Sequence, residues 1–253
     1  MTSLIVGRNA VVEALKQARD IDKILLYREA HGEGIGDIRR LAKQQNIPIQ
    51  HVPMEKLSAL TKTQHQGVVA IGALIKYYNV QEVLDHVYSE GEIPLFIILD
   101  GVTDVRNIGA IARTALCCGA HAIIIPDSGA AALQEDAVKA SAGALLQVMV
   151  CRVHSLAKTA DELHLNGFQI VASIMQATAN VFDINFTLPT AIIMGGEEKG
   201  IQPVLQKIAD QLFKIPMPGK FDSLNVSVAT GMVLYEAMKQ RMSCPIIMAE
   251  KNY

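Results

Sequence analysis

The chain has 253 residues but no tryptophan, and aromatic residues make up only 5% of it. Platforms that stack single-stranded nucleic acid are built from such rings, so few can exist here. Long apolar runs are also missing, since the stretches 95–99 and 120–126 are far shorter than the roughly 20 residues of a membrane-spanning helix. The start, Met1-Thr-Ser-Leu, lacks the basic and apolar regions of a signal peptide. We therefore expect a cytoplasmic protein with no membrane partner.

Cysteine is scarce too. The four cysteines, Cys117, Cys118, Cys151 and Cys244, form no CxxC pair, and no histidine stands at zinc-ligand spacing. Such a pattern is typical of reduced core thiols in a cytosolic protein. We predict no metal site.

Charged residues make up 19% of the chain and hydrophobic residues 50%, which is ample for one large domain or two modest ones. The net charge of −2 argues against a strongly basic nucleic-acid binder. Residues 1–75 nevertheless hold ten Lys and Arg against seven Asp and Glu. This first segment is the better candidate for contact with a polyanion.

The pattern of apolar residues changes along the chain. Residues 1–75 predict a small α/β domain, with helices over 8–17, 35–45 and 53–60 and strands over 22–27, 47–52 and 67–74. Residues 76–93 are more polar, with one short helix over 80–88, and predict a linker.

Residues 94–253 predict a second α/β domain. Continuous apolar strands are expected over 95–99, 122–125, 145–150, 169–174, 191–194 and 212–215, and helices over 108–118, 131–140, 155–165, 204–210 and 226–241. Buried strands alternating with helices indicate a mainly parallel sheet covered on both faces.

Several common signatures are absent. The chain has no G-x-G-x-x-G turn, no Walker A loop and no G-x-S-x-G elbow, and no histidine is placed for a catalytic triad. Hydride transfer, nucleotide hydrolysis and serine-hydrolase chemistry are therefore disfavoured.

Three polar segments follow predicted strands at the edge where open α/β sheets bind ligands. They are 100–113 (DGVTDVRNIGAIAR), 195–201 (GGEEKGI) and 215–229 (IPMPGKFDSLNVSVA). In the third, Pro216, Pro218 and Gly219 force an irregular backbone. Ser223 or Asn225 can cap the helix that follows, which also leaves amide groups pointing at one spot.

Taken in order, these segments resemble the three motifs of the SpoU/TrmH family of the SPOUT class, RNA ribose 2′-O-methyltransferases. The resemblance covers essentially the whole chain, and the segment 65–68 (HQGV) is similar to that family's L30e-like substrate-binding domain. The stretch 6–15 looks most like the branch that modifies a guanosine of large-subunit (23S) ribosomal RNA.

The resemblance implies two domains joined by the linker over 76–93: an RNA-binding L30e-like domain over 1–75 and a SPOUT methyltransferase domain over 94–253 with a C-terminal trefoil knot. It also implies S-adenosylmethionine (AdoMet) as methyl donor, and a homodimer with shared active sites. Transfer RNA as substrate, or a non-catalytic RNA-binding ribosome-assembly factor, remain alternatives.

The residues that match the family's catalytic positions are Asn107, Arg113, Glu197, Ser223 and Asn225. The family proposal makes Arg113 a base, but because a free guanidinium rarely loses its proton we favour a phosphate clamp. An ion pair with Asp100 or Asp104 would be its structural alternative. Helix capping is the alternative for Asn107, Ser223 and Asn225, and a solvent-facing turn for Glu197.

Cofactor contacts are expected from residues of the second and third segments, namely Gly195, Gly196, Gly200, Ile215, Met217 and Leu224. The glycines would permit close backbone approach, although ordinary turn glycines look the same. Candidate RNA contacts are Arg8, Arg39, Arg40, Lys62 and Arg106. Arg106 lies where the first motif departs from the common Asp-Pro-x-Asn form, as Asp104-Val-Arg-Asn107.

Overall fold

The computed structural model describes residues 3–131, 133–219 and 223–243. The chain forms two units, with the boundary between Lys76 and Tyr77, and a short segment that ends at Glu135 groups with the first unit. The elements of the first unit are β1 (Leu4–Val6), α1 (Arg8–Lys16), β2 (Ile21–Tyr27), α2 (Ile35–Gln44), β3 (Ile49–Val52), α3 (Met54–Leu60) and β4 (Val68–Gly72).

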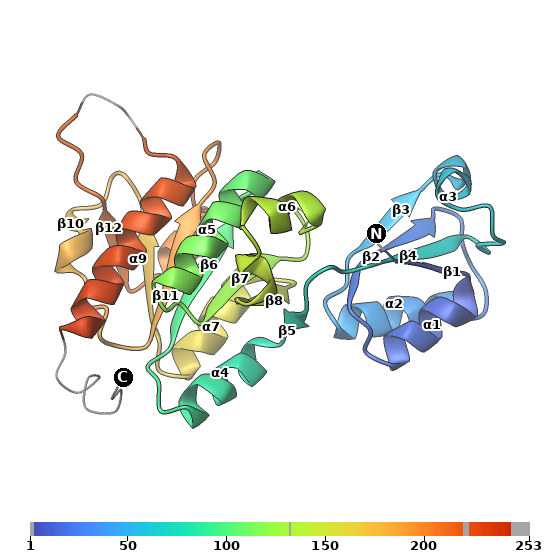
Figure 1. Ribbon diagram of the computed structural model, residues 1–253, viewed down its shortest axis with the longest axis horizontal. Helices are drawn as coiled ribbons and strands as arrows, with labels where there is room; N and C mark the ends of the chain where they lie inside the picture. Colours follow the sequence, from blue (N-terminus) through green and yellow to red (C-terminus); the bar gives the residue numbers. More distant parts are fainter. Residues whose placement is uncertain (1–2, 132, 220–222, 244–253) are drawn as a thin grey trace. The chain divides into compact units, whose positions relative to one another are not determined.

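The first unit is built on a mixed sheet in the order β1-β4-β2-β3. β4 pairs antiparallel with β1 and β2, and β2 pairs parallel with β3. The alternation of β2 sends Ile24 to one face, where it packs with Val11 of α1 and Ile38 of α2. Leu25 points to the other face and packs with Leu57 of α3. Figure 1 shows α1 and α2 together beneath this sheet and α3 on its other side.

From Tyr77 onward the chain alternates strands and helices. The elements are β5 (Tyr77–Tyr78), α4 (Val80–Ser89), β6 (Leu95–Asp100), α5 (Val105–Cys117), β7 (Ala122–Pro126), α6 (Glu135–Ala140), the 3₁₀ turn η1 (Ala144–Leu146), β8 (Met149–Val153), α7 (Leu156–Leu165), β9 (Gln169–Ser173), β10 (Ala179–Asn180), η2 (Val181–Asp183), β11 (Thr190–Gly195), α8 (Pro203–Ile208), β12 (Gln211–Lys214) and α9 (Val226–Met242).

These strands form one sheet in the order β10-β12-β9-β11-β6-β7-β8-β5. Every pairing between its described strands is parallel. Helices α4, α7 and α8 bury Leu84, Leu163 and Leu205 in a core with one face of the sheet. On the opposite face α5 and α9 pack side by side (Figure 1). The predicted parallel sheet with helices on both faces is confirmed.

The segment 76–93 does more than link two domains. β5 pairs with β8, with Tyr77 opposite Val150, and α4 buries Val83, Leu84 and Val87 in the core of the second unit. A two-residue strand is too short to show the alternation of apolar and polar residues that identifies a strand. The segment also looks polar in composition, because α4 has a polar face as well as the apolar face that it buries. The structure therefore places residues 77–93 in the second unit, while Lys76 stays with the first.

The strand predicted over 145–150 begins later, at Met149. Ala142 and Gly143 have positive φ, and the buried Ser141 hydroxyl oxygen accepts from the backbone N–H of Leu145. These residues lead into the 3₁₀ turn η1, which contains the first residues of the apolar run 145–150. Met149 then pairs with Ala122 of β7.

The end of α9 is fixed by Arg241. Its guanidinium donates to the carbonyl oxygens of Ile93, Pro94, Phe186 and Leu188 at 2.5–3.1 Å. Burial lowers the pKa of Arg241 to about 10. The guanidinium thereby ties the end of α9 to the segment before β6 and to the loop before β11.

The cysteines differ from the expectation of core thiols. Cys151 is buried, and burial raises its pKa to about 12. Cys118 is half-buried, which raises its pKa as well, but Cys117 is exposed at the end of α5. Cys244 lies outside the described residues, and so do residues 220–222 within the segment of the expected knot, which stays a prediction.

Candidate active site

The first two polar segments leave the sheet from neighbouring strands. β6 and β11 pair in register, so that Gly195 lies opposite Asp100. The buried Asp100 carboxylate accepts from the backbone N–H and the side-chain amide of Gln202, both at 2.7 Å. The end of β6 is thus tied to the start of α8, and the loop 195–201 between them is held at both ends.

Two glycines of this loop are required by the packing of the chain itself. A Cβ at Gly195 would collide with the Gly200–Ile201 backbone, and one at Gly196 would collide with the carbonyl of Gly101. Gly200 instead has open space around it but a φ of +61°. The loop therefore folds back on itself and on the first segment, which is a reason for glycine beyond the approach of a cofactor.

Asp104 begins α5, since its side chain accepts from the backbone N–H of Arg106 at 2.8 Å. The Arg106 guanidinium also lies 3.0 Å from Oδ2 of Asp104, and these bonds hold the pKa of Asp104 below its ordinary value. Capping of α5 by Asn107, one alternative from the sequence, is thereby wrong. Asn107 lies within the first turn, and its side chain is left for other contacts.

Those contacts join all three segments. Asn107 donates to Oε1 of Glu197 at 3.3 Å, and Asn225 donates to the same oxygen at 2.6 Å and to Oδ1 of Asn107 at 3.0 Å. The Oδ1 atom of Asn225 caps α9 by accepting from the N–H groups of Ser227 and Val228. Because the cap occupies its oxygen, the amide nitrogen of Asn225 must face Glu197.

Arg113 lies two turns further along α5, and its side chain is exposed. It makes no hydrogen bond or ion pair with any part of the chain that the structure describes. The carboxylates of Asp100 and Asp104 are bound to Gln202 and Arg106, so neither forms the ion pair considered from the sequence. The guanidinium is therefore available to an anion from outside the chain.

A cavity of about 320 Å³ lies beside this cluster. All six residues predicted to contact the cofactor line it, together with Glu197 and Ser223. Asn107, Arg113 and Asn225 are not among its lining residues. The volume falls at the lower end of the range of about 300–1,000 Å³ for small-molecule sites.

Other lining residues escaped the sequence analysis. The loop after β9 contributes Ile174, Met175 and Gln176, while Lys199 and Lys214 add two ammonium groups. The position of β9 between β11 and β12 is the signal that could have found the loop, because ligands bind beyond the carboxyl ends of parallel strands. The cavity thus combines glycine backbone, apolar walls and cations, which fits a small molecule with an apolar ring and a carboxylate.

The five residues predicted to contact RNA are distributed over both units. Arg8 and Lys62 line a separate cavity in the first unit. Arg39 and Arg40 lie exposed on α2, where Arg40 pairs with Asp37. Arg106 stands with its guanidinium on Asp104 at the start of α5.

Two further searches cover only the described ranges. No three His, Cys, Asp or Glu side chains there converge in a way that could hold a metal ion. No helix in the same ranges is both long and apolar enough to cross a bilayer.

Comparison with known proteins adds two family matches. The model of the SpoU rRNA Methylase family matches residues 94–235, and the model described as RNA 2′-O ribose methyltransferase substrate binding matches residues 4–78. The first match spans the whole cavity and the Asn107–Glu197–Asn225 cluster.

Individual proteins are similar over nearly the full chain. YacO of Bacillus subtilis (strain 168), named for the TrmH family of tRNA/rRNA methyltransferases, is 37% identical over 94% of this chain and 95% of its own length. A protein of Staphylococcus epidermidis named for the same family is 39% identical over 94% and 96%. The structure of the SpoU methyltransferase AviRb of Streptomyces viridochromogenes, in complex with AdoMet, is 25% identical, with a TM-score of 0.62 over 96% and 92% of the two chains. The chain therefore belongs to the SpoU/TrmH family of AdoMet-dependent RNA 2′-O-ribose methyltransferases.

Proposed function

We propose that this protein methylates the ribose of a guanosine in large-subunit (23S) ribosomal RNA. The observation that carries a methyl-transfer site is a cavity lined by the second and third segments, with Asn107 of the first segment hydrogen-bonded beside it to Glu197 and Asn225. The N-terminal unit, which matches a substrate-binding model and carries the excess of basic residues, supports an RNA substrate. The resemblance of the stretch 6–15 to the branch that modifies large-subunit RNA favours ribosomal RNA.

The residues of the cavity fit AdoMet. Gly195, Gly196 and Gly200 would bring main chain against it, and Ile215 and Leu224 would form apolar walls. When bound, AdoMet supplies a methyl group on a sulfonium centre, which a ribose 2′-oxygen can displace in line. The protein's task is then to hold the hydroxyl in position, because orientation supplies much of the rate.

Arg113 suits that task as a clamp. Its guanidinium is exposed and unpaired among the described residues, and a guanidinium keeps its proton near neutral pH. Bidentate hydrogen bonds to an RNA phosphate would orient the ribose and draw negative charge away from the hydroxyl. Ser223, exposed on the rim of the cavity, would hold the same phosphate or the adjacent ribose.

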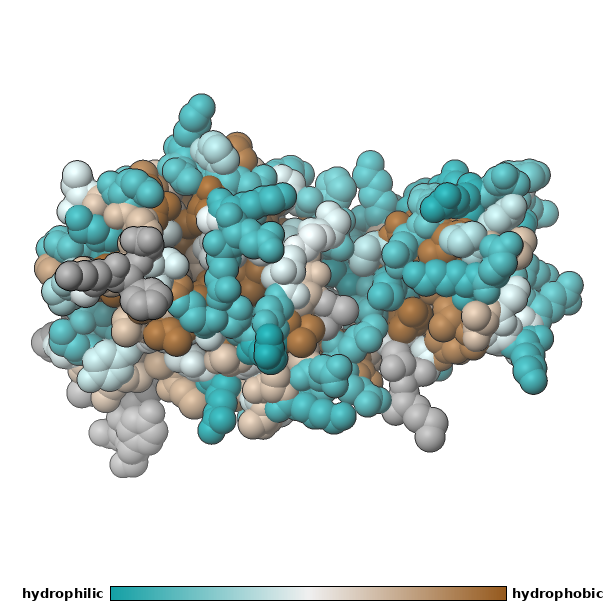
Figure 2. All heavy atoms as spheres, turned by 90° about the horizontal axis from the view of Figure 1, so that it is seen from above, coloured by the Kyte–Doolittle hydropathy of each residue, from teal (hydrophilic) through white to brown (hydrophobic). Residues whose placement is uncertain are grey.

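The active form would be a homodimer. α9 carries an exposed apolar stripe of Val228, Met232 and Tyr235, at the spacing of one helix face. Leu116 at the end of α5, which packs beside α9, is exposed as well. Hydrophobic side chains are visible on the surface of the larger unit in Figure 2. A second copy of the same stripe would cover it in a two-fold contact.

Ribose-methylation mapping of ribosomal and transfer RNA, from cells with and without the protein, tests the substrate. We expect one guanosine of large-subunit RNA to lose its methyl group when the protein is absent. Loss at a transfer RNA position would instead establish the alternative substrate. If purified protein binds AdoMet but no RNA position changes, a role as a non-catalytic assembly factor becomes the better account.

A further inference from the structure

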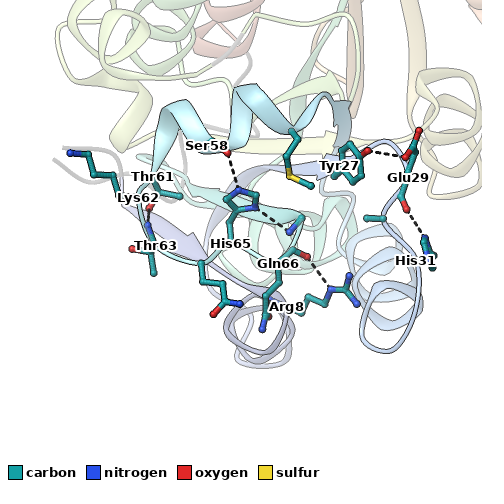
Figure 3. Close-up of a pocket in the computed structure, with 14 residues that line it drawn as sticks. Arg8, Tyr27, Glu29, His31, Ser58, Thr61, Lys62, Thr63, His65 and Gln66 are labelled. Atoms are coloured by element: carbon teal, nitrogen blue, oxygen red, sulfur yellow. Dashed lines mark hydrogen bonds between the residues drawn. The ribbon is translucent and has the colours of Figure 1, made fainter.

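The N-terminal unit holds a cavity of about 720 Å³ that methyl transfer itself does not require. It lies within the first unit, between α3, the loop 61–67 and the end of β2 (Figure 3). Its lining includes Arg8, Tyr27, Glu29, Ser58, Lys62 and His65. Two permanent cations, two polar groups, one carboxylate and one aromatic ring therefore face a space larger than one nucleotide.

The wall formed by His65 is ordered by hydrogen bonds. The backbone N–H of Gly67 donates to Nδ1 of His65 at 3.1 Å, so the neutral ring carries its proton on Nε2. Nε2 lies 3.3 Å from the hydroxyl oxygen of Ser58 and donates to it, which leaves the Ser58 proton free to point into the cavity (Figure 3). Ser58 therefore keeps its own proton available as a donor.

The loop beside His65 has an unusual backbone. Gln66 has a φ of +48° and Gly67 a φ of +80°, and a left-handed conformation is uncommon for a residue like glutamine. Arg8 holds this conformation, because its backbone N–H donates to Oε1 of Gln66 and its Nε donates to the Gln66 carbonyl at 3.0 Å. Strained residues held in this way are concentrated at ligand-binding sites.

The cations of the cavity are not neutralised from within. Arg8 donates to the carbonyls of Gln66 and Glu33 and to the side-chain oxygen of Gln66, so its charge meets no carboxylate among the residues described. Lys62 is exposed and has no ion pair in the same ranges. Both cations are free to meet an external anion such as a phosphate.

The far side of the cavity has a different chemistry. The hydroxyl of Tyr27 donates to Oε2 of Glu29 at 2.8 Å, and this bond raises the pKa of Tyr27 (Figure 3). Oε1 of Glu29 accepts no hydrogen bond from the described chain. An aromatic face next to a fixed carboxylate oxygen can stack a base and accept from N–H groups on its edge.

We propose that this cavity takes one unpaired nucleotide of the RNA substrate. Arg8 and Lys62 meet its phosphates, the Tyr27 ring stacks on its base, and Oε1 of Glu29 accepts from the base edge. Guanine offers adjacent N–H donors on one edge and is therefore preferred over uracil, whose single N–H lies between two carbonyls. The inference rests on the proposed function and extends it, by stating how the N-terminal unit recognises RNA.

Methyl NMR of the full-length protein labelled with ¹³C at methionine methyls locates the binding directly. Met54 lines this cavity, whereas Met194 and Met217 line the cavity proposed for AdoMet. The probes are a single-stranded 12-nucleotide RNA of mixed sequence, a duplex of the same sequence, inorganic phosphate and AdoMet. We expect the single strand to shift Met54 at concentrations where the duplex and phosphate do not.

The AdoMet and RNA titrations test the proposed function and the nucleotide cavity separately. AdoMet that leaves Met194 and Met217 unmoved contradicts the proposed function, whatever RNA does. Single-stranded RNA that binds without moving Met54 overturns the nucleotide cavity and leaves methyl transfer untouched. A duplex that moves Met54 as strongly as the single strand also overturns it.

Matched variants then test the individual contacts by fluorescence anisotropy with the single strand. Lys62→Gln should lower the salt slope of the logarithm of affinity by about 0.7, the value for one phosphate contact on a single strand, while Lys43→Gln on α2 should not. Tyr27→Phe loses the bond to Glu29 but keeps the ring, and should bind at least about fivefold more tightly than Tyr27→Leu. Equal slopes for the two lysine variants, or equal affinities for the two tyrosine variants, would count against the assigned contacts.

A variant of Glu29 tests the predicted preference for guanine. With 12-nucleotide RNAs that differ only in one central guanosine or uridine, the wild type should favour guanosine, and Glu29→Gln should reduce that preference. An unchanged preference in Glu29→Gln would remove Glu29 from base recognition.

Discussion

The side-chain nitrogen of Asn225 lies 2.6 Å from Oε1 of Glu197, although 28 residues separate them. The same side chain caps α9 with its oxygen. One residue therefore fixes the start of a helix and the position of a carboxylate beside the cavity, so that capping and site geometry are coupled.

Asn225→Asp should separate the two roles. The cap survives, since aspartate is as good an N-cap as asparagine, but two carboxylates now face each other. We expect kcat/KM for RNA methylation to fall at least about tenfold, which corresponds to about 1.4 kcal/mol. The double variant Asn225→Asp/Glu197→Gln, which exchanges donor and acceptor, should recover much of the activity. A single variant as active as the wild type would contradict the coupling.

Arg113→Ala should abolish most activity without loss of stability. The side chain is exposed and unpaired among the described residues, so the free energy of unfolding should change by no more than about 0.5 kcal/mol. Loss of a charged donor at a reacting site costs on the order of 100-fold in kcat. Arg113→Lys keeps the charge and should retain part of the activity with an unchanged pH profile. A pH profile that follows the pKa of lysine would support a base in place of a clamp.

Glycine-to-alanine variants of the loop 195–201 should differ in their cost. Gly196→Ala places a methyl group against the Gly101 carbonyl and should destabilise the second unit by about 1–3 kcal/mol. In Gly200→Ala the added methyl group meets open space, so only the positive φ lowers the free energy of unfolding, by about 1 kcal/mol. Gly36→Ala in α2 should be neutral or stabilising, because the added methyl group contacts no other atom and the residue has no positive φ. Thermal unfolding of the three variants checks this order.

The apolar stripe of α9 should decide the oligomeric state. Met232→Glu combined with Tyr235→Glu places two charges on it and should yield a monomer by analytical ultracentrifugation. Leu165→Glu is the control, because Leu165 is 89% exposed at the end of α7 and lies outside the stripe. If the double variant sediments as the wild type does, the dimer contact lies elsewhere.

Thiol reactivity should follow burial. In a Cys244→Ser background at pH 8, a disulfide reagent should modify Cys117 quickly and Cys151 only on unfolding. The raised pKa of Cys151 also affects stability. The protonated thiol is common to the folded and unfolded states below about pH 9, but between about pH 9 and 12 only the unfolded thiol ionises, so its contribution to stability is lost as pH rises. Rapid modification of Cys151 in the folded protein would contradict its burial.

Local sequence determined much of this protein. Apolar runs and their breaks predicted most of the strands and helices in their order, the parallel sheet and the placement of three polar segments at strand ends, but not the short strands β1, β5 and β10. The cap at Asn225 was also predictable, because it depends on contacts with the next three residues. Short-range preferences suffice for all of these features.

Only the tertiary structure decided which side chains meet. Asn107 and Asn225 are 118 residues apart, and their contact depends on the strand order β12-β9-β11-β6, which no local pattern records. The same applies to Gly196, whose missing Cβ is explained by the carbonyl of Gly101, and to Gln66, whose strained backbone is held by Arg8. Long-range packing fixes these positions, because each is set by an element distant in sequence.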